Sequence, residues 1–200
     1  MISITLSDVV DVFSKSGRSK ATKVRQIKHR SEYQPATDYY RPLRAALTEI
    51  HANGKDRDAL DAIVPSIKDP KKITNYQELV TAYGKFWGRK KVGWFTPPRG
   101  SYSSNGVEII VNPELGLIID GRRVVIKLYL KGDEISKAQI ELIPVLMELV
   151  LRAQVSDDTL MAILDVRKSK LHLLGTGSIP TLTAMINAEL SYVATLWPSL

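Results

Sequence analysis

Three short runs rich in β-branched and aliphatic residues, at positions 107–111, 115–119 and 123–130, follow one another closely along the chain. The sequences between them are Asn-Pro-Glu and Asp-Gly-Arg, which contain the residues typical of tight turns. Connections this short are too short for a crossover helix, so consecutive strands joined by them pair antiparallel. Residues 107–130 therefore predict an antiparallel meander, and the other elements have to pack around it.

Segments with helical periodicity flank this meander on both sides. Apolar residues recur at helical spacing within 5–16, 14–30, 36–52 and 75–87 before it, and within 136–152 and from Pro180 onward after it. Residues 161–166 and 171–174 are β-like, whereas the Ser/Tyr/Asn-rich residues 94–105 indicate a loop. We therefore predict an α+β fold, in which a helical N-terminal part packs on a meander sheet flanked by helices.

A polar stretch at residues 66–72, with a proline at each margin, is the candidate domain boundary. It divides the chain into a basic helical part, residues 1–72, and an α/β core, residues 73–200. The alternative is a single compact domain, which a length of 200 residues also allows.

The positive charge is concentrated in the first half of the chain. Residues 1–100 contain 19 Lys and Arg against 10 Asp and Glu, whereas residues 101–200 contain 9 against 11. No acid interrupts the densest run of cations, which is Lys15, Arg18, Lys20, Lys23, Arg25, Lys28 and Arg30. Such a run is typical of a surface that contacts nucleic acid phosphates, and its alternative interpretation is a solvated helix face.

Several classes of chemistry find no support in the sequence. The chain has no Cys, which excludes disulfides, thiol nucleophiles and Cys-ligated metals and is compatible with a cytoplasmic protein. Its three His residues are far apart, and no phosphate-binding glycine motif or serine-hydrolase motif is present. We also expect neither a signal peptide nor a membrane span, because no long uninterrupted apolar stretch occurs.

One segment suggests a nuclease. Pro113-Glu114 precedes one β-rich run, Val125-Ile126-Lys127 lies in the next, and the surrounding order is helix, strand, strand, strand, helix, strand. This pattern resembles the PD-(D/E)XK superfamily, which has the restriction-endonuclease-like fold. The resemblance implies Mg²⁺-dependent phosphodiester hydrolysis, with Glu114 as metal ligand and Lys127 orienting the attacking water. The sequence departs from the family at Val125, where the second acid belongs, so catalysis stays an open question.

Strand register brings Glu114 and Lys127 together. With Gly121-Arg122 as the two-residue turn, Glu114 lies opposite Tyr129 and diagonal to Lys127 on the same face, and Asp120 is a turn residue. The alternative is a structural ion pair on a half-exposed sheet.

The leading hypothesis is therefore a nucleic-acid-associated protein with a degenerate nuclease-like core. Its alternative is a non-enzymatic domain that binds another protein. Tyr33, Tyr39 and Tyr40 follow the basic run and either stack on bases or pack in the core.

Overall fold

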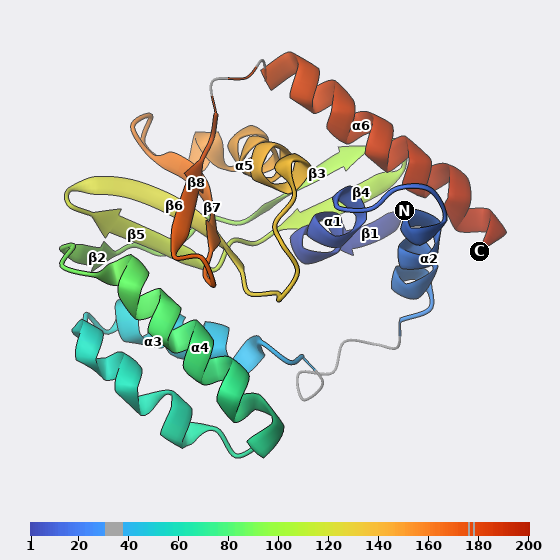
Figure 1. Cartoon of the computed structure of the whole chain (residues 1–200). Helices are drawn as coiled ribbons and strands as arrows, with labels where there is room; N and C mark the ends of the chain where they lie inside the picture. The colour runs from blue at the N-terminus through green and yellow to red at the C-terminus, as the bar shows by residue number, and fades with distance from the viewer. Residues whose placement is uncertain (31–37, 176, 178) are drawn as a thin grey trace.

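The computed structural model of the protein describes residues 1–30, 38–175, 177 and 179–200. Its α+β architecture confirms the predicted fold class (Figure 1). The helices are α1 (Leu6–Phe13), α2 (Gly17–Lys28), α3 (Arg41–Ala52), α4 (Pro70–Trp87), α5 (Lys137–Leu151) and α6 (Ile179–Leu196). The strands are β1 (Ile2–Thr5), β2 (Val92–Trp94), β3 (Gly100–Ser104), β4 (Val107–Val111), β5 (Leu115–Ile119), β6 (Arg122–Tyr129), β7 (Leu160–Asp165) and β8 (Lys170–Leu173). Short 3₁₀ turns occupy Arg57–Ala62, Val64–Ser66, Arg152–Gln154 and Trp197–Ser199.

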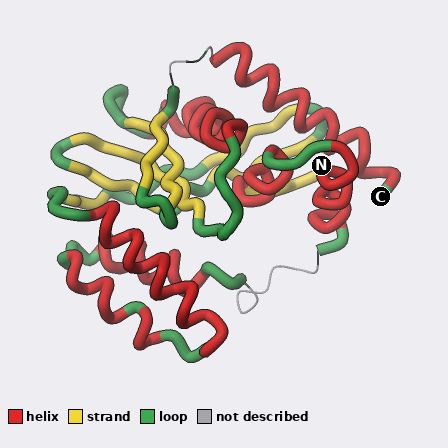
Figure 2. Tube along the Cα trace, in the orientation of Figure 1, coloured by secondary structure: helices red, strands yellow, loops and turns green. Residues whose placement is uncertain are grey.

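The strands form two sheets (Figure 2). One sheet has five strands in the order β2-β5-β6-β7-β8, and the other has three in the order β1-β4-β3. Strand β6 pairs parallel with β7 through the crossover helix α5, whereas β5 and β6 form an antiparallel hairpin. The predicted three-strand meander is therefore wrong in one respect, because β4 does not pair with β5. Both edges of β4 are already occupied, by β3 and by a parallel β1, and β5 pairs with β2 instead.

Helices cover both faces of the five-stranded sheet. Alternating side chains of β6 point to opposite faces, so Ile126 lies in one core and Val125 in the other. The first core contains Leu47 of α3 and Tyr83 of α4, and the second contains Leu146 of α5 together with residues of α1, α6 and the smaller sheet. Because α3, which lies before the expected boundary, shares a core with β5 and β6, which lie after it, residues 1–72 do not pack separately from the rest.

The turn of the β5–β6 hairpin differs from the predicted turn. Asp120 and Gly121 occupy it, with φ of 49° and 86°, and Ile119 pairs with Arg122. A two-residue hairpin turn of this kind needs positive φ at both positions, which Gly and Asp tolerate and Arg does not. The register therefore shifts by two residues from our prediction. A shift of two preserves the face of every side chain, since strand side chains alternate with period two.

Other differences occur at the edges of elements. Residues 94–105, predicted as a loop, contribute to β2 and β3, and β3 turns into β4 through Asn105-Gly106, a strong hairpin signal. Helix α4 begins at Pro70 inside the predicted linker, because Asp69 caps it by accepting a hydrogen bond from the Lys71 N–H at 3.0 Å. The start predicted for α3 at residue 36 lies outside the described residues.

His51 makes folding stability sensitive to acid. The side chain is buried in α3, its Nε2 lies 2.7 Å from the Tyr83 hydroxyl, and its ring stacks on Trp87. Burial lowers the pKa of His51 to about 4, below its ordinary value of 6.5. The folded state therefore binds fewer protons than the unfolded state between these values, and stability falls as pH drops through that window. At pH 5 we expect His51 to reduce the free energy of unfolding by about 2 kcal/mol relative to pH 7.

Urea unfolding of the wild type and of His51→Gln at pH 7 and pH 5 measures this contribution. Carboxylate titration affects both proteins equally, so the difference between their pH dependences isolates His51. An identical loss of stability in both proteins between the two pH values would contradict the prediction.

Candidate functional site

Glu114, the residue directly before β5, lies opposite Lys127 of β6. The Lys127 ammonium donates to Glu114 Oε1 at 2.5 Å, and the Leu128 N–H donates to Glu114 Oε2 at 2.8 Å. Lys127 is only 3% exposed. The prediction that the two side chains share a face and meet is confirmed, although they are direct cross-strand neighbours and not diagonal ones. Both carboxylate oxygens of Glu114 already accept a hydrogen bond.

The residues around this pair do not form a magnesium site. Val125, at the position of the missing acid, is fully buried and packs in the core with α5 and β7. No group of three or more His, Cys, Asp or Glu side chains converges anywhere in the part of the chain that the structure describes. Mg²⁺ requires several hard oxygen ligands, whereas this site offers one carboxylate that is already hydrogen-bonded. The residue set therefore does not fit the metal that the family resemblance implies.

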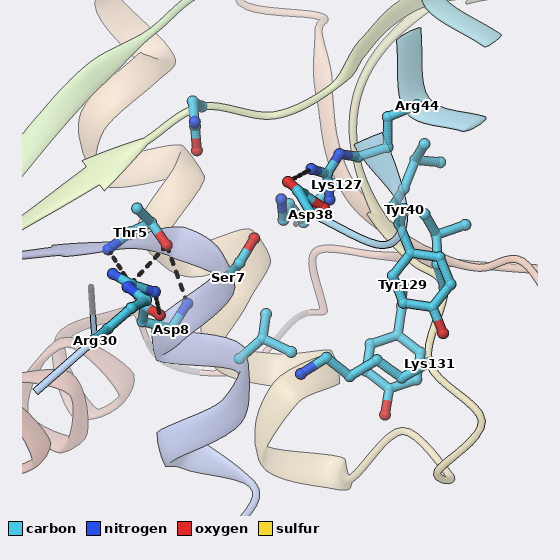
Figure 3. Close-up of a pocket in the computed structure, with 14 residues that line it drawn as sticks. Thr5, Ser7, Asp8, Arg30, Asp38, Tyr40, Arg44, Lys127, Tyr129 and Lys131 are labelled. Atoms are coloured by element: carbon cyan, nitrogen blue, oxygen red, sulfur yellow. Dashed lines mark hydrogen bonds and ion pairs between the residues drawn. The ribbon is translucent and has the colours of Figure 1, made fainter. Parts of the chain in front are cut away.

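Two adjoining hollows surround Lys127 instead. The larger, of about 530 Å³, lies between α1, the segment preceding α3, and the end of β6, and the smaller has about 220 Å³. They share Ser7, Arg44, Asn112 and Lys127. Figure 3 shows the larger hollow, with Thr5, Asp8 and Arg30 on one side and Tyr40 and Tyr129 on the other.

Each acid that lines the larger hollow is bound by an arginine. Arg30 contacts both carboxylate oxygens of Asp8, at 2.7 and 3.2 Å, and Arg44 lies 2.5 Å from Asp38. Burial raises the pKa of Asp8, but hydrogen bonds from Arg30 and from Thr5 outweigh it and hold the pKa below its usual value. Thr5 and Asp8 also form a capping box at the start of α1.

The smaller hollow has the stronger positive charge. Four cations line it, Arg41, Arg44, Arg99 and Lys127, against the single carboxylate of Glu114. Arg44 and Lys127 have acidic partners, whereas the exposed side chains of Arg41 and Arg99 make no hydrogen bond or ion pair with any described residue. These two guanidinium groups are therefore available for a ligand.

Most of the predicted basic run is used internally. Lys20 pairs with Glu189 of α6 at 2.7 Å, Lys23 pairs with Asp11 of α1 at 2.7 Å, and Arg30 holds Asp8. The Lys28 ammonium donates to the carbonyls of Trp197 and Leu200 near the end of the chain. Within the described residues the side chains left exposed and unpaired are those of Lys15, Arg18 and Arg25. Helix α2 therefore uses three of its five cations to attach itself to α1, to α6 and to the residues that follow α6.

The two described tyrosines that follow the basic run, Tyr39 and Tyr40, both pack against the core that contains α3 and α4. Tyr39 is half-buried and makes edge contacts with Tyr40 and Tyr76, so it packs at the margin of the core. Tyr40, also half-buried, lines the larger hollow. Tyr33 lies outside the described residues.

Sequence reasoning missed the cations that matter most in the smaller hollow. Arg41 and Arg44 are three residues apart in the first turn of α3, and Arg99 follows two prolines in the loop before β3. Their spacing resembles no motif, and 58 residues separate Arg41 from Arg99. The one local signal is the absence of any acid from the first turn of α3, where acids are usually favoured.

Comparison with known proteins adds no assignment, because no family model and no curated protein sequence matches this chain. None of the described helices is both long and apolar enough to cross a membrane.

Proposed function

We propose that this protein binds nucleic acid without cleaving it, through the cationic hollow beside Lys127 on a restriction-endonuclease-like core. The observation that carries the proposal is the pair of free guanidinium groups, Arg41 and Arg99, next to a buried ammonium. Arginine forks match phosphate oxygens in shape and charge, and release of counterions from the phosphates supplies affinity without sequence preference.

The order of elements supports the nuclease-like core. Along the chain, α4, β2, β5, β6, α5 and β7 give helix, strand, strand, strand, helix, strand, and all four strands are neighbours in one sheet. Strand β2 takes the place that we assigned to residues 107–111, because β3 and β4 leave to form the smaller sheet. Glu114 directly precedes β5, and Lys127 lies on β6, as the family pattern requires.

The same residues argue against catalysis. A hydrolytic site of this family holds a metal between two acids, whereas here Val125 is buried in the core and Glu114 accepts bonds from Lys127 and the Leu128 N–H. A binding role keeps the fold and its positive charge and needs no metal. We therefore derive no metal-dependent step for this protein.

Fluorescence anisotropy with labelled single-stranded and duplex DNA and RNA, in EDTA across a salt series, tests the proposal. We expect log affinity to fall linearly with log salt. Removing two phosphate contacts by Arg41→Gln/Arg99→Gln should reduce the slope by about two and lower affinity about tenfold near 0.1 M salt. The matched control is Lys85→Gln/Arg89→Gln, which removes two exposed charges, one from the last turn of α4 and one from the turn after it, and should leave the affinity nearly unchanged.

Absence of binding at low salt would contradict the proposal and favour the alternative of a protein-binding domain. An equal loss of affinity in both double variants would show that only net charge matters. Fragments released when Mg²⁺ replaces EDTA would contradict binding without cleavage.

A further inference from the structure

We infer that the smaller hollow binds the phosphomonoester group of a nucleotide, carried on the end of a strand or on a free nucleotide. This inference rests on the proposed function and specifies which chemical group the hollow recognises.

The charge of the hollow matches a doubly charged anion better than a singly charged one. Four cations face one carboxylate there, and that carboxylate, Glu114, already accepts hydrogen bonds through both of its oxygens. A phosphodiester carries one negative charge, whereas a phosphomonoester carries about 1.5 to 2 at pH 7 and has three acceptor oxygens. A phosphomonoester therefore interacts more favourably with the same set of cations than a phosphodiester does.

Lys127 provides an independent indication of a ligand. Its ammonium has three hydrogen-bond donors, and in the described structure only one of them has a partner, the Glu114 carboxylate. Lys127 is nevertheless 3% exposed and lines both hollows. A buried donor without a partner costs free energy, and a phosphate oxygen in the hollow would satisfy it.

The first turn of α3 carries an excess of positive charge. It contains Arg41 and Arg44 and no acid, although cations are unfavourable at the positive end of a helix dipole. The Asp38 carboxylate offsets Arg44, and nothing described offsets Arg41. An anion bound at this end would interact favourably with both arginines and with the dipole.

The adjoining hollow has room for the rest of a nucleotide. It opens from the shared residues Ser7, Arg44, Asn112 and Lys127 toward the half-buried ring of Tyr40 (Figure 3). Ser7 and Asn112 add a hydroxyl and an amide that have no hydrogen-bond partner among the described residues. With the phosphate in the smaller hollow, the sugar and base would extend into the larger one, where Tyr40 offers a ring for stacking.

The test compares two single-stranded oligonucleotides of identical sequence, labelled at the 3′ end, with either a 5′-phosphate or a 5′-hydroxyl group. In EDTA at constant ionic strength we expect the wild type to bind the phosphorylated strand at least about tenfold more tightly, because several charge-assisted hydrogen bonds are added. In Arg41→Gln/Arg99→Gln this ratio should fall close to one. In Lys15→Gln/Arg25→Gln, which removes two exposed cations of the basic run, affinity for both strands should change in parallel and the ratio should persist.

A competition arm distinguishes the two sources of the phosphate. If adenosine 5′-monophosphate displaces the phosphorylated strand as effectively as an unlabelled strand does, the hollow is assigned to a free nucleotide. If only the unlabelled strand displaces it, the hollow is assigned to a strand end. Equal wild-type affinity for both strands overturns the inference and leaves the proposed function standing. Binding of adenosine monophosphate without binding of either strand overturns the proposed function and keeps the hollow as a phosphomonoester site.

Discussion

Replacing Lys127 by Met is expected to lower the free energy of unfolding by about 3 to 5 kcal/mol, because it leaves a buried carboxylate without its counter-charge. Lys127 is nearly inaccessible to water, and its partner Glu114, directly before β5, is mostly buried. Met has a volume and length close to those of the lysine stem, so little of the loss comes from packing. Urea unfolding followed by circular dichroism measures the change.

A double variant separates the charge effect from other causes. In Lys127→Met/Glu114→Gln neither residue of the pair is charged. The glutamine oxygen can still accept the hydrogen bond that the Leu128 N–H donates to Glu114 in the wild type. We expect this protein to be more stable than Lys127→Met alone, with a coupling energy of about 1 to 3 kcal/mol. A single Lys127→Met variant that lost less than about 1 kcal/mol would show that water reaches the pair, as at an ordinary surface salt bridge.

Gly116→Ala is expected to cost about 3 kcal/mol, at the upper end of the range for overpacking. A methyl group at Gly116 would lie 2.3 Å from the Phe95 carbonyl oxygen and 2.9 Å from its ring. The carbonyl cannot withdraw easily, because the Phe95 N–H donates to the Gly116 carbonyl at 2.9 Å and fixes the two segments together. The Phe95 ring is held in turn by the guanidinium of Arg123, 4.1 Å from its centroid.

The control for this substitution is Gly132→Ala, at a glycine with nothing within 4 Å of the added methyl group and no positive φ. It should change the free energy of unfolding by less than about 1 kcal/mol, in the stabilising direction if anything. Thermal and urea unfolding of both variants make the comparison. Equal stabilities would mean that β5 can move away from Phe95.

Local interactions explain what could be predicted from the sequence. The capping boxes at Thr5 with Asp8 and at Ser136 with Gln139 are local, because each joins residues three positions apart, and they begin two of the helices that the periodicity predicts. The β5–β6 hairpin was predicted because its turn is only two residues long. Its register was predicted two residues away from the observed one, and the face of Lys127 was nevertheless right, since strand parity is unaffected by a shift of two.

Long-range pairing explains what could not be predicted. The short strands β1 and β2 are stabilised by pairing with the edges of β4 and β5. Strands of three or four residues are too short for their periodicity to predict them from the sequence. The internal use of Lys20 depends on α6, and that of Lys28 depends on the residues after α6, about 170 residues further along the chain. Counting cations along the sequence therefore overestimates how many cations of α2 are free to bind a ligand.

The sequence by itself determined the fold class, the positions of most helices, the β5–β6 hairpin and the meeting of Glu114 with Lys127, because each depends on residues close in sequence or on strand parity. Only the tertiary structure decided that α3 and the loop before β3 bring Arg41 and Arg99 to that pair, and that Val125 is buried in the core. Those contacts join segments up to 86 residues apart, from Arg41 to Lys127, and their formation depends on packing of whole elements and not on any local preference.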